Sequence, residues 1–165
     1  AVRAAQISVP GSQEVKIHVA AHGPKMLEAM HQLVDGVSTF LQTPEHTAVV
    51  RQRIPEKSSL NVSQMCLPCD EPVEARRLAR RALGFYMGLE YYHRAWRILG
   101  FDDADFAGGG SDRLIDALVA WGTLDSISER LAQHGEAGAT ELVVIPLKPT
   151  GGAEPHLPLL EGLAQ

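Results

Sequence analysis

Residues 16–40 constrain the fold of this chain more than any other stretch, because their pattern is that of a strand, a turn, a helix and a second strand. Apolar and other residues alternate over 17–22, which is the period of a half-buried strand. Gly23-Pro24 then ends the strand and opens a helix, since proline suits a first helical turn, where its missing N–H is not needed. An Asp-Gly pair ends that helix before the apolar run at 37–41. The stretch therefore predicts a β-α-β unit.

The rest of the chain repeats this unit. Residues 60–67 and 141–147 predict two more strands, and the second of these is a nearly continuous apolar run, as in strands that are covered on both faces. With the strands expected at 15–21 and 37–41, this gives four strands. We expect helices between and after them, over 25–33, 44–53, 71–99, 112–121, 124–134 and 157–164. Four βα units predict an α/β protein with a parallel sheet.

The length of 165 residues, with a mass of 17.9 kDa, suits one domain. We expect an irregular segment at 1–14 and a (βα)4 domain at 15–165. Two architectures are open at this point. One is half of an eight-stranded TIM-type (β/α)8 barrel, whose whole form needs about 250 residues, and the other is an open doubly wound sheet. Both place ligands at the carboxyl ends of their strands.

Composition argues against several classes of function. A net charge of −5 and a pI near 5.8 disfavour a nucleic-acid partner, which requires concentrated Lys and Arg. No apolar run approaches the roughly 18 residues of a membrane span, and residues 1–13 lack the pattern of a signal peptide. The two cysteines cannot build a disulfide framework, so we expect a reducing, cytoplasmic setting. The first residue is not Met, and we expect a processed product or a fragment.

Residues 71–99 form the longest helical region. Apolar residues recur there at spacings of three and four and form one stripe, while Gly84 and Gly88 weaken its middle, so we expect two helices that meet at an angle. The arginines of this region lie mostly off the stripe, at Arg76, Arg77, Arg80 and Arg81. They could serve an anionic partner, but a solvated helix face with neighbouring glutamates as ion-pair partners is the favoured interpretation.

Several motifs follow one another in an order that is typical of one protein family. They are Val19-Ala-Ala-His-Gly-Pro-Lys-Met, the segment from Phe85 to Trp96, Gly109-Gly-Ser-Asp-Arg-Leu-Ile-Asp-Ala-Leu and Glu136-Ala-Gly-Ala-Thr-Glu-Leu-Val-Val. Together they resemble the luciferase-like monooxygenase family, and within it the oxidoreductases that depend on a deazaflavin, coenzyme F-420. The resemblance covers residues 16–165.

The resemblance implies both a fold and an activity. Only the carboxyl-terminal half of the family's barrel has a counterpart here, which implies four parallel βα units, equivalent to strands five to eight of the TIM-type barrel. The implied activity is hydride transfer between a deazaflavin, or alternatively flavin mononucleotide (FMN), and a small organic substrate. The amino-terminal half carries most of the family's catalytic side chains, so no catalytic residue is assigned to this chain.

A second function is also open, that of a truncated, non-catalytic module that binds a ligand or only assembles. A half-barrel leaves two sheet edges and an apolar inner face exposed, and proteins normally cover such surfaces. We therefore expect a homodimer, or assembly with the missing amino-terminal half-barrel.

The turn after the first strand is the first candidate site. It contains Ala20, Ala21, His22 and Gly23, and its mostly small side chains let a ring or a phosphate approach the backbone. The resemblance implies that these four residues contact the cofactor. The alternative is a tight turn that is packed for its own sake.

The glycine-rich stretch before the helix at 112–121 is the second candidate site. Gly109, Gly110, Ser111 and Arg113 combine a permissive backbone, a helix start and a cation, which suits an anion or an anionic substrate. By the resemblance, this stretch follows strand seven of the barrel, and barrel enzymes frequently bind phosphate there. The alternative is a flexible linker that ends in an ordinary capped helix.

Two further residue pairs, one of histidines and one of cysteines, are weaker candidates for a metal site or a redox site. His18 and His22 lie on one face of the first strand, but no third ligand follows at a recognisable spacing, so we expect no metal site. Cys66 and Cys69 fit the C-x-x-C pattern. In redox proteins the first cysteine of this pattern lies at a helix start, which lowers the pKa of its thiol. Here the pair comes at the end of a strand instead. A thiol redox protein is a third hypothesis, and structural cysteines are the favoured interpretation.

Overall fold

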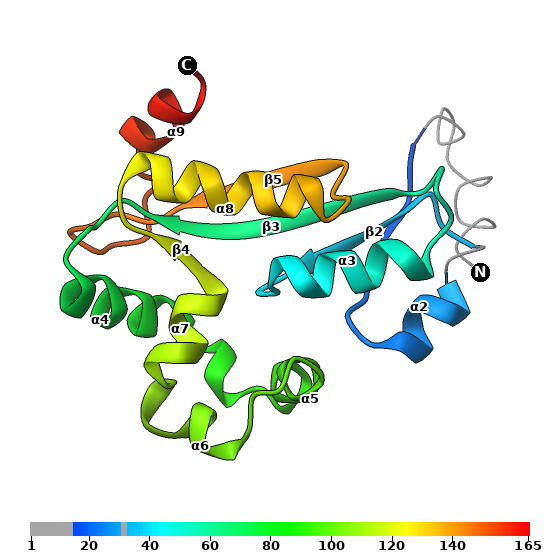
Figure 1. Cartoon of the computed structure of the whole chain (residues 1–165), viewed down its shortest axis with the longest axis horizontal. Helices are drawn as coiled ribbons and strands as arrows, with labels where there is room; N and C mark the ends of the chain where they lie inside the picture. Colours follow the sequence, from blue (N-terminus) through cyan, green and yellow to red (C-terminus); the bar gives the residue numbers. More distant parts are fainter. Residues whose placement is uncertain (1–14, 31–32) are drawn as a thin grey trace.

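A parallel β-sheet organises the chain (Figure 1). The structure, a computed structural model, describes residues 15–30 and 33–165. Its strands are β1 (His18–Ala20), β2 (Gly36–Phe40), β3 (Ser59–Leu67), β4 (Val119–Trp121) and β5 (Glu141–Pro146). Each strand pair in the sheet is parallel, so the predicted α/β class is confirmed.

Strand β3 is the centre of the sheet. Met65 pairs with Val119 of β4 on one edge and with Ile145 of β5 on the other edge. Strand β2 lies on the same edge as β4, because Ser63 pairs with β2 and β5 together. Strands β1, β2, β3 and β5 therefore lie side by side in chain order, with β4 beyond the end of β2. This order is that of half a TIM-type barrel, whereas a doubly wound sheet reverses its strand order.

Helices follow the strands, and hydroxyl side chains cap the amino-terminal ends of three of them. The helices are α2 (Pro24–Met30), α3 (Pro44–Arg53), α4 (Pro72–Leu83), α5 (Glu90–Ile98), α6 (Asp103–Phe106), α7 (Asp112–Leu118), α8 (Leu124–Glu136) and α9 (Leu157–Leu163), with 3-10 turns at Tyr86–Gly88 and Ala107–Gly109. Thr43, Ser111 and Thr123 precede α3, α7 and α8, and each side chain accepts the backbone N–H three residues on. These bonds satisfy N–H groups that have no partner within the helix.

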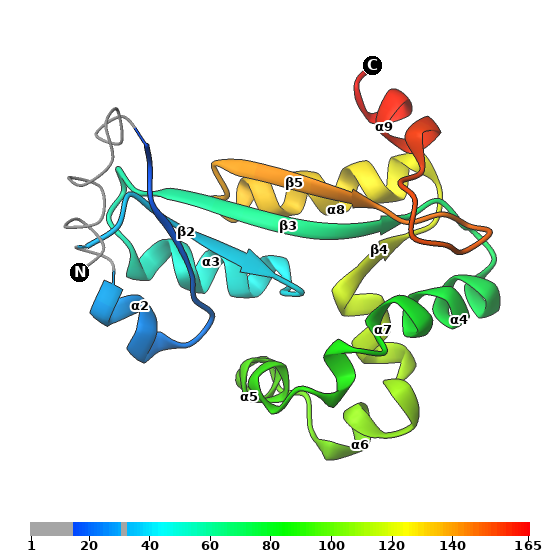
Figure 2. The same cartoon turned by 180° about the vertical axis from the view of Figure 1, so that it is seen from behind.

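One face of the sheet is covered by α3 and α8, which lie in front of it in Figure 1 and behind it in Figure 2. Leu60 and Val62 of β3 are buried there in a cluster with residues of α2 and α3. Cys66, further along the same strand, is buried with residues of α8 and α9. Their spacing is the period of two that a strand imposes on its side chains.

The opposite, inner face of the sheet has two parts. At its carboxyl end, Met65 and Leu67 pack against α4, α5 and α7 in an apolar cluster that includes the fully buried Trp96. At its amino end the strands present polar side chains, at His18, Ser38, Ser59, Asn61 and Glu141. We expected the whole inner face to be apolar, and that expectation is wrong for its amino end. The apolar residues that alternate with these polar ones, Leu60 and Val62, point to the helix-covered face instead.

The segment 112–121 also differs from the prediction of a single helix. Helix α7 ends at Leu118, and residues Val119–Trp121 form β4. They pair with Met65–Leu67 of β3. Strand β2 pairs with β3 only as far as Ser63, so β4 takes the same edge further along. Because unpaired backbone groups at a buried strand edge are costly, pairing overrides the helical pattern of these residues.

The expected break within 71–99 is confirmed. Helix α4 ends at Leu83 and α5 begins at Glu90, and Figure 1 shows α4 from the side but α5 along its axis. The segment expected to be irregular, 1–14, lies outside the described residues, as do positions 31–32 of the first expected helix. Among the described helices, none has the length and hydropathy of a transmembrane span.

Candidate functional site

A cavity of 700 Å³ lies at the carboxyl end of β1. The turn after β1 and the start of α2 form one side of it, and α5 forms the other. Ala20, His22 and Gly23 line the first side, and Tyr91 and Ile98 are among the residues that line the second. The sequence therefore located one wall of this cavity, and the fold adds a second wall from a helix about 70 residues later.

The small residues of the turn divide between the cavity and the core. Ala20 is exposed and Gly23 is open, since a Cβ added at Gly23 would meet no atom within 4 Å. Ala21 is fully buried in the apolar cluster behind the turn. Of the predicted contacts, Ala20 and Gly23 are thus open to a ligand, His22 lines the cavity with a buried ring, and Ala21 supports the turn from inside.

His22 holds the turn against β2. Its ring is buried, its Nε2 accepts the backbone N–H of Phe40 at 3.3 Å, and its Nδ1 lies 3.3 Å from the side-chain amide of Gln42. His46 Nε2 donates to the His22 carbonyl at 3.0 Å. Burial, assisted by the neighbouring His46, lowers the pKa of His22 to about 4. The side chain is therefore neutral at pH 7 and does not supply a positive charge to the cavity.

Aromatic rings form the second wall. Tyr91 of α5 lies 5.3 Å from the His22 ring and is 54% exposed, and Tyr92 lies 5.7 Å from the same ring. Burial raises the pKa of Tyr92 to about 12, with Tyr86 and Tyr91 adding to the shift. Both phenols are neutral at pH 7, and the positive charges that line the cavity come from Arg94 on the same wall and Lys25 on the first wall. The structure places Tyr91 on the cavity.

Ala95 and Ile98 were missed by the sequence analysis, although they line the same cavity. They lie three residues apart on one face of α5, and Ile98 is 58% exposed despite its apolar side chain. The available signal in the sequence was an isoleucine three residues after an alanine, and the partner of that helix face is not readable from the sequence.

The second candidate site, the glycine-rich stretch before α7, forms contacts within the protein. The Ser111 hydroxyl donates to the Asp105 carboxylate at 2.6 Å, and Arg113 pairs with the same carboxylate. The Arg113 guanidinium also lies 4.4 Å from the centre of the Phe101 ring. Arg80 Nε donates to the Gly110 carbonyl at 2.9 Å. Asp105 thus balances the charge of Arg113, and the role of Gly109, Gly110, Ser111 and Arg113 in ligand binding stays a prediction.

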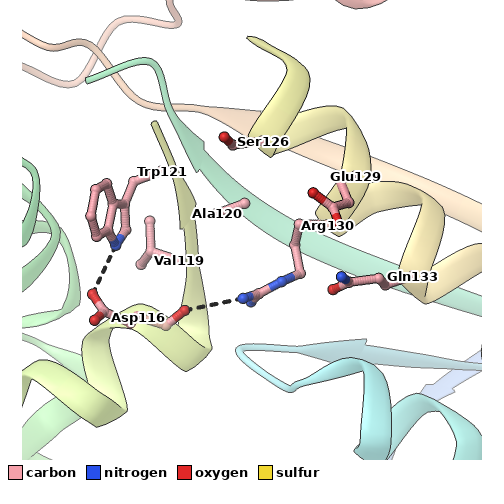
Figure 3. Close-up of a pocket in the computed structure, with 8 residues that line it drawn as sticks. All are labelled: Asp116, Val119, Ala120, Trp121, Ser126, Glu129, Arg130 and Gln133. Atoms are coloured by element: carbon pink, nitrogen blue, oxygen red, sulfur yellow. Dashed lines mark hydrogen bonds between the residues drawn. The ribbon is translucent and has the colours of Figure 1, made fainter. Parts of the chain in front are cut away.

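A smaller cavity of 290 Å³ lies between β4 and α8 (Figure 3). Arg130 reaches across it and donates to the carbonyls of Ala117 at 3.0 Å and Asp116 at 3.3 Å. The Asp116 carboxylate accepts the Nε1 proton of Trp121 at 2.9 Å and binds Arg76 through two hydrogen bonds. Since Arg130 bonds to carbonyls at the end of α7, its charge stabilises that helix end. We assign this cavity a structural role.

The cysteines lie on opposite faces of the sheet. Cys66 is buried beneath α8 and α9, while Cys69 packs against the cluster that contains α4. Both are free, and burial raises the pKa of the Cys66 thiol to about 12. Such a thiol is protonated at neutral pH, which disfavours thiol redox chemistry. Within residues 15–30 and 33–165, no three His, Cys, Asp or Glu side chains come together as a metal ion would require.

Comparison with known protein families finds none that matches this sequence, and no curated protein matches it either. Solved structures do match its fold. The coenzyme F420 dependent tetrahydromethanopterin reductase from Methanopyrus kandleri superposes with a TM-score of 0.56 at 18% sequence identity, over 84% of this chain and 47% of the reductase. For apo-MsnO8 the TM-score is 0.47 at 18% identity, over 82% of this chain and 46% of that one.

The match to the reductase agrees with the strand order. The chain spans about half the length of the reductase. Its parallel sheet and helices form one half of a TIM-type barrel, with the 700 Å³ cavity at the carboxyl end of a strand. The chain therefore shares the fold of an oxidoreductase that is dependent on coenzyme F420.

Proposed function

We propose that this chain is the cofactor-holding half of a luciferase-like oxidoreductase, with a deazaflavin of the F420 type as its cofactor. The observation that carries the proposal is the cavity between the turn at 20–23 and α5. It lies at the edge of the sheet where barrel proteins bind their ligands. The fold shared with an F420-dependent reductase supports the identity of the cofactor.

The residues that are present fit a planar ring system. The cavity volume of 700 Å³ lies within the range of about 300–1,000 Å³ that small-molecule sites occupy. Ala20 and Gly23 leave the backbone accessible on one side, and the Tyr91 ring offers an uncharged aromatic face on the other. Flat aromatic groups pack well against such a surface.

When bound, such a cofactor supplies hydride transfer to or from a small organic substrate. The residues of this chain would bind and orient it. Ala20 and Gly23 would allow close approach, and Tyr91 would cover one face. Neutral His22 would keep the turn in place through its bond from Phe40. No acid or base is assigned within the chain, and FMN in the same cavity is the alternative cofactor.

We further propose that the half-barrel acts as a homodimer or together with an amino-terminal half-barrel. Within the described residues, β1 and β5 each pair along one edge only. Leu142 and Val143 of β5 are 39% and 43% exposed. Free strand edges with exposed apolar residues are typical of surfaces that a partner covers. The free cysteines suit a reducing, cytoplasmic compartment.

The same open edges favour a second candidate function, a non-catalytic module that assembles or binds a ligand without turnover. In this candidate function the chain uses the same cavity as in the oxidoreductase proposal, but no partner supplies catalytic residues. Activity in an assembled complex would separate the two, because the module would bind the cofactor and still leave its redox state unchanged.

The proposal is tested by fluorescence titration with a deazaflavin and with FMN. We expect saturable binding of the deazaflavin by the wild-type protein and at least tenfold weaker binding by Gly23→Leu. A larger side chain at this position enters the cavity and not the core, because the position is open. Gly135→Leu on α8, where the space is also open, is the matched control. Binding of neither cofactor, or equal binding by both variants, would refute the proposal.

A further inference from the structure

Among the arginines of α4, Arg81 has no ion-pair partner within residues 15–30 and 33–165. Arg76 binds Asp116, Arg77 binds Glu74 at 2.6 Å, and Arg80 binds Asp112. Arg81, the fourth member, forms no ion pair with any residue in the described part of the chain. The favoured interpretation, neighbouring glutamates as ion-pair partners, therefore holds for Arg77, whereas Arg76 and Arg80 pair with aspartates of α7 and the exposed Arg81 pairs with no acid of the described residues.

Arg81 lies against the loop that follows β5. A Cβ added at Gly151 would come within 3.2 Å of its Nη1, so the guanidinium sits beside the backbone of that glycine. Gly151 and Gly152 have φ angles of +76° and +107°, which L side chains rarely adopt. The glycine pair thus allows the loop to pass closely over a cation. In Figures 1 and 2 this loop and α4 both lie at the carboxyl end of β3.

A cavity of 320 Å³ opens between the loop and α4. Its apolar lining consists of the partly exposed Leu147 after β5, above the buried Leu67 at the end of β3 and Leu78 on α4. Arg81 and Lys148 supply its cations, and Lys148 is shared with the exposed Glu154. The cavity therefore pairs apolar walls with two positive groups at the carboxyl ends of adjacent strands, the edge where barrels bind ligands. None of its lining residues lines the 700 Å³ cavity.

We propose that this cavity binds a phosphate group carried by an apolar organic molecule. Arg81 is the principal ligand of the phosphate, since a guanidinium matches two phosphate oxygens at once. Lys148 adds a second positive charge, and its partner Glu154 turns toward solvent when the phosphate binds. The leucine walls receive the apolar part of the ligand. The proposal concerns a second site and does not depend on deazaflavin binding.

The probes are inorganic phosphate, phenyl phosphate and benzoate, and calorimetry measures their affinity for the wild-type chain and two variants. We expect phenyl phosphate to bind more tightly than inorganic phosphate, because its ring reaches the leucines. We expect Arg81→Gln to weaken phenyl phosphate binding on the order of tenfold, the effect of losing one charge-assisted contact. Arg77→Gln, on the same helix with its charge directed to Glu74, is the matched control and should change the affinity less than twofold.

Three results would overturn the proposal. They are absence of saturable phenyl phosphate binding, equal weakening by Arg81→Gln and Arg77→Gln, and benzoate binding as tight as that of phenyl phosphate. Both variants should have the same midpoint temperature of thermal unfolding as the wild type, which verifies that the fold is kept. Gly23→Leu should leave phenyl phosphate binding unchanged, so failure of the deazaflavin proposal and failure of this one give different results.

Discussion

His22 Nε2 accepts the backbone N–H of Phe40 at 3.3 Å, and this bond ties the turn after β1 to the end of β2. An accepting ring nitrogen carries no proton, so the bond exists only while that nitrogen is deprotonated. Burial and the neighbouring His46 lower the pKa of His22 to about 4 and keep the ring neutral at pH 7. The wall of the 700 Å³ cavity therefore depends on the protonation state of one buried side chain.

We predict that the free energy of unfolding decreases between pH 7 and pH 4. Burial, with Arg130 nearby, also lowers the pKa of His134 to about 4. Both folded pKa values lie below the unfolded value of about 6.5, so the unfolded chain binds more protons in this range. The stabilisation is complete above about pH 6.5 and is lost as the pH falls through the folded pKa, by up to about 3 kcal/mol for each ring. Urea unfolding at pH 7 and pH 4.5 measures the loss.

A double variant isolates the contribution of these rings. His22→Gln with His134→Gln removes both titrations, so its stability should change less with pH than that of the wild type. His156→Gln, in the loop before α9, is the control and should keep the wild-type pH dependence. The same pH dependence in the double variant and the wild type would contradict the assignment to these histidines.

We predict that Gly36→Ala destabilises the protein by about 2 kcal/mol or more. A Cβ at this position would lie 2.7 Å from the Ser59 carbonyl oxygen and 2.9 Å from His18 Cε1. Because one of these atoms belongs to the backbone of β3, the contact can be relieved only by shifting the sheet. Urea unfolding gives the change in stability.

The matched control for this prediction is Gly135→Ala. Gly135 lies within α8, and a Cβ there would meet no atom within 4 Å. Since alanine is a better helix former than glycine, by about 1 kcal/mol in a helix interior, this variant should be as stable as the wild type or more stable. Equal destabilisation by both alanines would show that close packing at Gly36 is not the cause.

The sequence was most informative where local chemistry decides the structure. Thr43, Ser111 and Thr123 were recognisable as helix caps, because a cap needs only a hydroxyl and the N–H groups of the next turn. The strand at 60–67 follows the loop at 55–59 and was recognisable from the sequence. It matches β3 within one residue at its start. These features depend on neighbours in the sequence and are therefore readable from it.

Features that depend on distant neighbours were not readable. Val119–Trp121 is too short to show a strand period, and it becomes a strand only because an edge of β3 is free beside it. The turn at 20–23 was recognisable, but its opposite wall comes from Tyr91 and Ile98, which approach it only in the folded chain. Arg113 was chosen as an anion ligand, yet the folded loop places the Asp105 carboxylate against it.

We predict that Cys69 reacts with a thiol reagent in the native protein and that Cys66 does not. Cys66 is fully buried and burial raises its pKa, whereas Cys69 is partly exposed. Reaction with Ellman's reagent should therefore label one thiol without denaturant and two in urea. Cys69→Ser should abolish native labelling, and Cys66→Ser should leave it unchanged. Rapid labelling of Cys66 in the folded chain would revive the thiol redox hypothesis.

We predict that Trp96→Phe destabilises the protein by about 2 to 3 kcal/mol. Trp96 Nε1 donates to the Leu41 carbonyl at 2.9 Å, and the indole ring is fully buried. Leu41 has a φ of +55°, so this bond anchors a backbone conformation that leucine rarely adopts. Phenylalanine removes the donor, leaves a buried carbonyl without its partner and opens a void. Urea unfolding measures the loss, with Phe85→Leu, at a side chain that is 73% exposed, as a control expected to change stability by less than about 0.5 kcal/mol. A Trp96→Phe variant as stable as this control would mean that the Leu41 carbonyl finds another donor.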